Sequence, residues 1–146
     1  MAIKGLKQTQ AMLKGKAKLY RNGVREVVRT TGSNVVFVAK LNAPQMIDKL
    51  ISGEIVSNQN GYGYIILVKG LPSENRLMRN IPVYLEFGTG IYAADYVPTL
   101  PKEWQDVAES FIENKKGKTK EHSYLVPAWI SQTNSFVLNV RKALQR

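Results

Sequence analysis

Apolar residues recur at steps of three, four or seven along the first 30 residues, which is the spacing of one face of an α-helix. Lysine and arginine side chains fill the positions between them. The pattern predicts an amphipathic helix over about residues 4–30 with a basic outer face, and its apolar face consists of Leu6, Leu13, Ala17, Tyr20, Val24 and Val27. Gly15 and Gly23 each weaken a helix by about 1 kcal/mol relative to alanine, so a bend or break is allowed there. We favour a core-covering role for this helix over binding to a membrane surface or to nucleic acid.

A break is predicted next, because residues 30–34 (TTGSN) combine helix-capping side chains with a glycine. The β-branched run at residues 35–41 (VVFVAKL) favours a strand by propensity. Its place between a cap and Pro44 also allows a second helix, and the run is too short for periodicity to decide. Pro44 ends either element, because it disfavours a helical conformation at the residue before it.

A β-hairpin is the most strongly indicated element of the middle of the chain. Gly53 is expected to turn the chain into it, and residues 54–58 then alternate in the manner of a strand. Asn60-Gly61 is typical of a tight hairpin turn, because both residues tolerate a positive φ. Residues 62–68 (YGYIILV) predict the returning strand, with the tip at residues 58–63, and residues 69–80 have the composition of a loop.

Residues 81–90 (IPVYLEFGTG) predict a short helix that begins at Pro82 and ends at Gly88. On this interpretation Val83, Tyr84, Leu85 and Phe87 pack inward. Glu86 has no packing role, so we expect it to pair with a lysine or arginine of its own chain or of a neighbouring subunit.

Residues 92–121 are interpreted as a partly mobile insertion loop. Within it, Pro101 opens a helix of about ten residues with one apolar face, formed by Trp104, Val107, Ala108, Phe111 and Ile112, and a basic run follows at residues 115–120. Pro127 then fits the first turn of a last helix, whose predicted inner face is Trp129, Ile130, Thr133, Phe136, Val137, Val140 and Leu144.

These elements predict one α+β domain over residues 1–146. An antiparallel sheet, formed by the hairpin at 54–68 and neighbouring strands, is packed by the N-terminal and C-terminal helices, and the insertion spans about 92–121.

The charge balance points to an acidic partner, because 21 Lys and Arg face 11 Asp and Glu, a net charge of +10 with pI near 9.9. Nucleic acid and an acidic protein both fit, and a charge spread only for solubility is the alternative. The absence of cysteine excludes disulfides and thiol chemistry. No apolar run approaches the roughly 20 residues of a membrane span, and the first residues lack a signal-peptide pattern. A cytoplasmic site of synthesis is therefore expected.

No catalytic, metal or cofactor site is predicted. His122 is the single histidine, and the acidic residues of the short helix step along its outer face without the spacing of a ligand set. Gly88-Thr89-Gly90 lacks the spacing and the lysine of a phosphate-binding loop. No nucleic-acid-binding motif occurs, so a nucleic-acid function would rest on basic charge alone.

Three stretches, in this order, carry a resemblance to a known family: Ala43-Pro44, residues 84–89 (YLEFGT) and residues 123–128 (SYLVPA). They resemble the minor tail, or tail-completion, proteins of long-tailed phages, which are also called head–tail joining proteins. The chain departs from the family pattern at residues 45–48 (QMID), where Asp-Thr-Gly is usual, and in the length of the 92–121 excursion.

The resemblance implies a non-enzymatic virion protein of the phage neck or tail, assembled in the host cytoplasm, with no cofactor and no membrane. It implies a homo-oligomeric ring, a hexamer or dodecamer. The implied partners are head-connector or adaptor proteins and tail-terminator or tail-tube proteins, and DNA could occupy the lumen. The motif residues are Pro44, Tyr84, Glu86, Phe87, Gly88, Thr89, Gly90, Tyr124 and Pro127. The candidate interface residues are Glu86, Trp104, Lys115, Lys116, Lys118 and Lys120. A basic nucleic-acid-binding module is the alternative, and a hydrolase that uses His122 is a third hypothesis.

Overall fold

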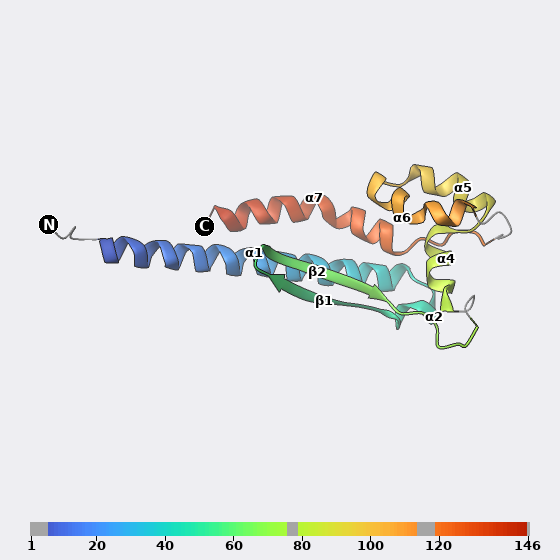
Figure 1. The fold of residues 1–146 in the computed structure, drawn as a ribbon, viewed down its shortest axis with the longest axis horizontal. Helices are drawn as coiled ribbons and strands as arrows, with labels where there is room; N and C mark the ends of the chain where they lie inside the picture. The colour runs from blue at the N-terminus through green and yellow to red at the C-terminus, as the bar shows by residue number, and fades with distance from the viewer. Residues whose placement is uncertain (1–5, 76–78, 114–118, 146) are drawn as a thin grey trace.

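The computed structural model describes residues 6–75, 79–113 and 119–145, with side-chain surroundings given outside residues 110–118. The fold is α+β, as predicted (Figure 1). Its elements, in chain order, are α1 (Leu6–Asn42), α2 (Gln45–Asp48), β1 (Ile51–Asn58), β2 (Gly61–Val68), α4 (Ile81–Phe87), α5 (Ile91–Tyr96), the 3-10 helix η1 (Val97–Thr99), α6 (Lys102–Glu113) and α7 (Leu125–Leu144).

Helix α1 is 37 residues long and runs straight through residues 30–34, so the predicted break is wrong. Residues 35–41, for which the sequence allowed either a strand or a helix, are part of helix α1. Val35 and Ala39 are fully buried in the core there. Burying a valine side chain such as that of Val35 contributes about 1.5–3 kcal/mol, whereas helix propensities of ordinary residues differ by up to about 0.7 kcal/mol. Tertiary packing therefore outweighs the β-branched propensity, and Gly15 and Gly23 do not interrupt the helix either.

The hairpin is confirmed, with β1 and β2 antiparallel and Asn58 paired with Gly61. The Asn58 side chain accepts hydrogen bonds from the backbone N–H groups of Asn60 (2.8 Å) and Gly61 (3.0 Å), which closes the turn. Two details differ from the prediction. Gly53 lies inside β1 and not at a turn. The described residues form a two-stranded sheet, so the expected neighbouring strands are not found there.

Helix α1 is the spine of the molecule (Figure 1). The hairpin and α7 both pack along it, and α7 runs antiparallel to it. One core cluster joins α1, the start of the hairpin and the start of α7, through Val35, Ala39, Ile47, Ile51, Tyr124 and Ala128. The short helices α4, α5 and α6 gather where α1 ends and α7 begins.

Residues 92–121 are not the long loop that was expected. Helices α5 and α6 and the 3-10 turn between them bury a second core cluster: Phe87, Ala93, Val97, Leu100, Ala108 and Val126. The described residues of 92–121 form a packed cluster because their apolar side chains contact Phe87 of α4 and Val126 of α7. The helix at Pro101 is confirmed, although Val107, predicted to face inward, is 62% exposed. The predicted basic loop tip lies largely outside the described residues.

The inward faces predicted for α4 and α7 are also partly wrong. Val83 is exposed on α4. On α7 the buried positions are Val126, Ala128 and Ala143, whereas five residues of the predicted inner face are exposed: Trp129, Ile130, Thr133, Val137 and Leu144. Small residues allow α7 to approach α1 closely, because a Cβ at Gly23 would lie 3.3 Å from the Ala143 Cβ. The larger side chains are therefore left at the margins of the contact.

Gly32 provides a test of the close packing between α1 and the hairpin. A Cβ at this position would lie 2.0 Å from the ring of Tyr64, so Gly32→Ala forces the hairpin away from the helix. We expect the free energy of unfolding in urea to fall by about 1–3 kcal/mol. Gly15→Ala is the matched control, since nothing lies within 4 Å of its Cβ. It should raise stability by up to about 1 kcal/mol through helix propensity. Equal effects of the two substitutions would contradict the packing.

Candidate functional site

A buried carboxylate joins α4 to the start of α7. Glu86 is 3% exposed. Its Oε2 accepts hydrogen bonds from the backbone N–H groups of Tyr124 (2.9 Å) and Leu125 (2.9 Å). Its Oε1 accepts from the backbone N–H of Val126 (2.8 Å) and from the hydroxyl of Ser123 (2.6 Å). Both oxygens are thus fully engaged.

These contacts make Glu86 the cap of α7. The first turn of a helix leaves backbone N–H groups without partners inside the helix. In α7 the first two of these N–H groups belong to Leu125 and Val126, and both donate hydrogen bonds to the Glu86 carboxylate. The third position is Pro127, which has no N–H. Tyr124, at the N-cap position, makes no side-chain capping bond. A negative charge here is also favoured by the helix dipole.

Among the described residues no lysine or arginine pairs with Glu86, so the charge pair predicted within its own chain is not found there. The ion pairs of the described residues are Arg29–Glu26 and Lys102–Asp106. Backbone N–H groups at the helix terminus supply the compensating partial charge in place of a cation. The burial of Glu86 leaves almost none of its side chain for a neighbouring subunit.

Further hydrogen bonds tie the segment before α7 to α4 and the turn that follows it. The backbone N–H of His122 donates to the carbonyl of Leu85 (2.6 Å), and the Tyr124 hydroxyl donates to the carbonyl of Pro82 (3.1 Å). Thr89 and Thr119 exchange two bonds: the Thr89 N–H donates to the Thr119 carbonyl, and the Thr119 N–H donates to Oγ1 of Thr89, both at 2.9 Å. The two segments therefore form one unit.

Gly88 is required in this unit. Gly88 has a φ of 72°, in a region of backbone conformation that residues with a Cβ rarely adopt. A Cβ there would lie 3.3 Å from backbone atoms of Ala93, Thr119 and Glu121. The prediction that Gly88 ends α4 is confirmed, and Gly90, with φ of 61°, starts α5.

Two tyrosines next to this unit have altered acidity. Burial, and secondarily the charge of Glu86, raise the pKa of Tyr124 well above its ordinary value. Burial also raises the pKa of Tyr96, and a hydrogen bond with Ser123 opposes that shift. Both phenols therefore act as neutral hydrogen-bonding groups and are unsuited to base catalysis near neutral pH.

The structure brings most of the predicted motif residues together around the start of α7: Glu86, Phe87, Gly88, Thr89, Tyr124 and Pro127. Trp104 joins them through Phe87, with ring centroids 6.2 Å apart. Tyr84 is half-buried in α4, whereas Pro44 is at the start of α2. Lys120 is exposed, and Lys115, Lys116 and Lys118 lie outside the described residues. The ring nitrogen Nε2 of His122 is 3.2 Å from the carbonyl oxygen of Asn42.

An open groove between β2 and α7 was missed by the sequence analysis. Two adjoining hollows, of about 820 and 220 Å³, share Tyr64, Trp129 and Thr133. Helix α1 lines the groove through Val28, Thr31 and Gly32, and Trp104 and Glu103 of α6 line its other end. The available signal was the set of aromatic residues on β2 and α7, of which Trp129 and Phe136 had been placed on the predicted inner face of the last helix. We call this feature the β2–α7 groove.

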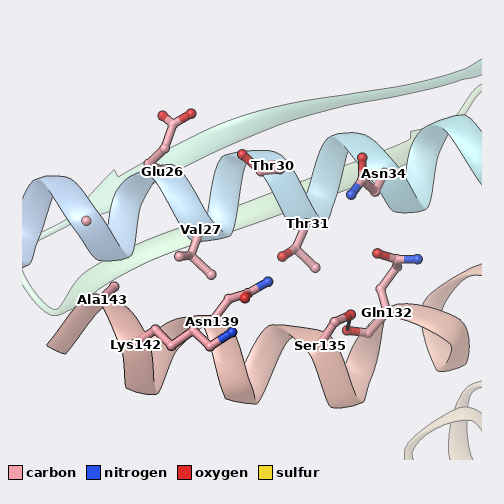
Figure 2. A pocket seen from close by; sticks show the side chains of 11 residues that line it. Glu26, Val27, Thr30, Thr31, Asn34, Gln132, Ser135, Asn139, Lys142 and Ala143 are labelled. Carbon is pink, nitrogen blue, oxygen red and sulfur yellow. Dashed lines mark hydrogen bonds between the residues drawn. The ribbon is translucent and has the colours of Figure 1, made fainter. Parts of the chain in front are cut away.

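A hollow of about 380 Å³, lined mainly by residues with polar side chains, lies between α1 and α7 (Figure 2). Figure 2 shows Thr31 and Asn34 of α1 above Gln132, Ser135 and Asn139 of α7. Glu26 of α1 and Lys142 of α7 also line this hollow, so its lining combines amides and hydroxyls with one acidic and one basic side chain. Among the described residues, no three His, Asp or Glu side chains gather as metal ligands.

None of the described helices is long and apolar enough to cross a membrane. No family model, curated protein or solved structure matches this chain.

The cap can be tested by Glu86→Gln. The amide keeps the shape of the side chain but turns an NH2 donor toward N–H donors, so we expect a loss of about 1–3 kcal/mol in the free energy of unfolding. Hydrogen exchange at Leu125 and Val126 should accelerate more than exchange in the middle of α1. Glu54→Gln, at an exposed strand position, is the control and should change stability by less than about 0.5 kcal/mol. If both variants were equally stable, Glu86 would not be the cap.

Proposed function

We propose that this chain is a structural, non-enzymatic subunit of the neck or tail of a long-tailed phage, where copies form a ring that joins the tail tube to the head connector. The observation that carries the proposal is the Glu86 cap. The two stretches with the most detailed resemblance to tail-completion proteins, residues 84–89 and 123–128, form one hydrogen-bonded unit across 38 residues of sequence. Glutamate, glycine and proline each have a physical role in that unit, so the shared pattern has a structural reason.

The surface supports a role in assembly. Exposed large apolar side chains occur along α1 and α7, among them Leu13, Leu19, Trp129 and Ile130, each at least 49% exposed. Trp129 and Ile130 lie together at one hollow, and contiguous exposed apolar surface is typical of protein–protein contact sites. The proposed ring is a hexamer or dodecamer, in the virion after assembly in the host cytoplasm. Its proposed partners are head-connector or adaptor proteins on one side and tail-terminator or tail-tube proteins on the other.

The proposal is tested by deleting the gene from the phage or prophage that carries it. Heads and tails should then accumulate unjoined in electron micrographs, and the protein supplied from a plasmid should restore joined particles. Joined heads and tails in particles that lack the protein, as verified by mass spectrometry, would contradict the proposal.

A basic nucleic-acid-binding module is the second candidate, and one observation favours it. Six basic side chains run along one side of α1 at helical spacing, all exposed: Lys7, Lys14, Lys18, Arg21, Arg25 and Arg29. This candidate expects the isolated protein to bind duplex DNA with an affinity that falls steeply as salt rises. An absence of binding at low salt would remove it without affecting the assembly proposal.

A further inference from the structure

The N-terminal part of α1 projects beyond the rest of the molecule. Figure 1 shows that it extends past the hairpin tip and past the C-terminal end of α7. Every residue from Leu6 to Leu19 is exposed. At 1.5 Å per residue this overhang is about 20 Å long. We refer to residues 6–19 as the α1 overhang.

The overhang has an apolar stripe that nothing in the described chain covers. Leu6, Leu13 and Ala17 continue, at steps of seven and four, the same face that α1 buries further along at Val28 and Val35. Leu6 and Leu13 are 54% and 62% exposed. An isolated helix of this length is marginal in water, and most helix stability comes from packing of the apolar face. The exposed apolar stripe therefore has the properties of a surface that packs against a partner.

The β2–α7 groove has the properties of the surface that would bind this stripe. It is lined by aromatic and aliphatic side chains, and two of these, Trp129 and Ile130, are 49% and 50% exposed. An amphipathic helix whose apolar face lies in an apolar groove is a recurring mode of recognition. The overhang cannot reach this groove in its own chain, because α1 is continuous and the groove lies alongside its later turns.

The charges of the two surfaces favour a contact between the overhang and the groove over a contact between two overhangs. The overhang carries Lys7, Lys14, Lys16 and Lys18 and no acidic residue, so two overhangs placed side by side would repel. The end of the groove is acidic. Glu103 lines it, and the exposed Asp106 and Glu109 follow on the same helix. The basic residue within α6 is Lys102, which pairs with Asp106 at 3.2 Å.

We propose that the α1 overhang of one copy of this chain occupies the β2–α7 groove of the next copy, with its lysines against the acidic α6. The contact joins two different surfaces, and repeated heterologous contacts close into a ring when the rotation between copies allows it. This inference deepens the proposed function, on which it rests for the place of the ring in a virion. The contact itself is a property of the isolated chain and is testable without a phage.

The test uses the absence of cysteine from the natural chain. Leu13→Cys is placed on the overhang of one batch and Thr133→Cys in the groove of another; both positions are exposed, so folding is retained. The two full-length proteins are mixed and treated with a short bismaleimide. We expect a cross-linked heterodimer on a denaturing gel. The control replaces Thr133→Cys by Leu138→Cys, an exposed position of the same helix that does not line the groove, and should give little product.

A homodimer of Leu13→Cys alone would overturn the proposal in favour of paired overhangs. No product above the Leu138 control, repeated with Leu6→Cys to cover a shift in register, would also overturn it. If rings nevertheless formed, that result would leave the proposed function standing. Charge reversal gives a second readout: Lys14→Glu should weaken self-association by up to about fivefold, and mixing it with Glu103→Lys should restore the cross-linking yield.

Discussion

The carboxylate of Glu86 decides where α7 begins, and the position of α7 decides most of the remaining architecture. A buried charge is costly unless it is hydrogen-bonded, and four donors from residues 123–126 satisfy this one. The same residues could not satisfy their own N–H groups, because the helix starts with no side-chain cap of its own. Each partner therefore needs the other, which fixes α4, the 88–90 turn and α7 as one unit.

That unit sets the geometry of the surface. The start of α7 is fixed by this unit, and the small buried residues Ala128 and Ala143 allow α7 to pack closely along α1. The hairpin packs on another face of α1, where Gly32 contacts Tyr64. Two elements that share one spine leave a groove between them, and the larger side chains of α7 line it. The short helices close the groove at one end with acidic residues, whereas the other end of the spine projects as a basic helix. Complementary surfaces at opposite ends favour head-to-tail assembly.

Local chemistry was readable from the sequence. Asn60-Gly61 located the hairpin, and Pro82 and Pro127 located the first turns of two helices, because each acts on its own backbone. The cap was not readable, since Glu86 bonds residues 37 to 40 positions away. The continuity of α1 was also missed, because burial of Val35 overrides a local capping signal. Trp129 was assigned to the core for the same reason that the groove was missed: periodicity identifies an apolar face but not what covers it.

Sedimentation velocity of the untagged full chain, at rising concentration and at low and high salt, tests most directly whether this chain assembles with itself. If copies assemble head to tail, the 16.4 kDa monomer gives way at low salt to one larger closed species. High salt should return that species toward the monomer, because exposed charges contribute to the contact. A chain that sediments as a monomer at every concentration in low salt would contradict head-to-tail assembly.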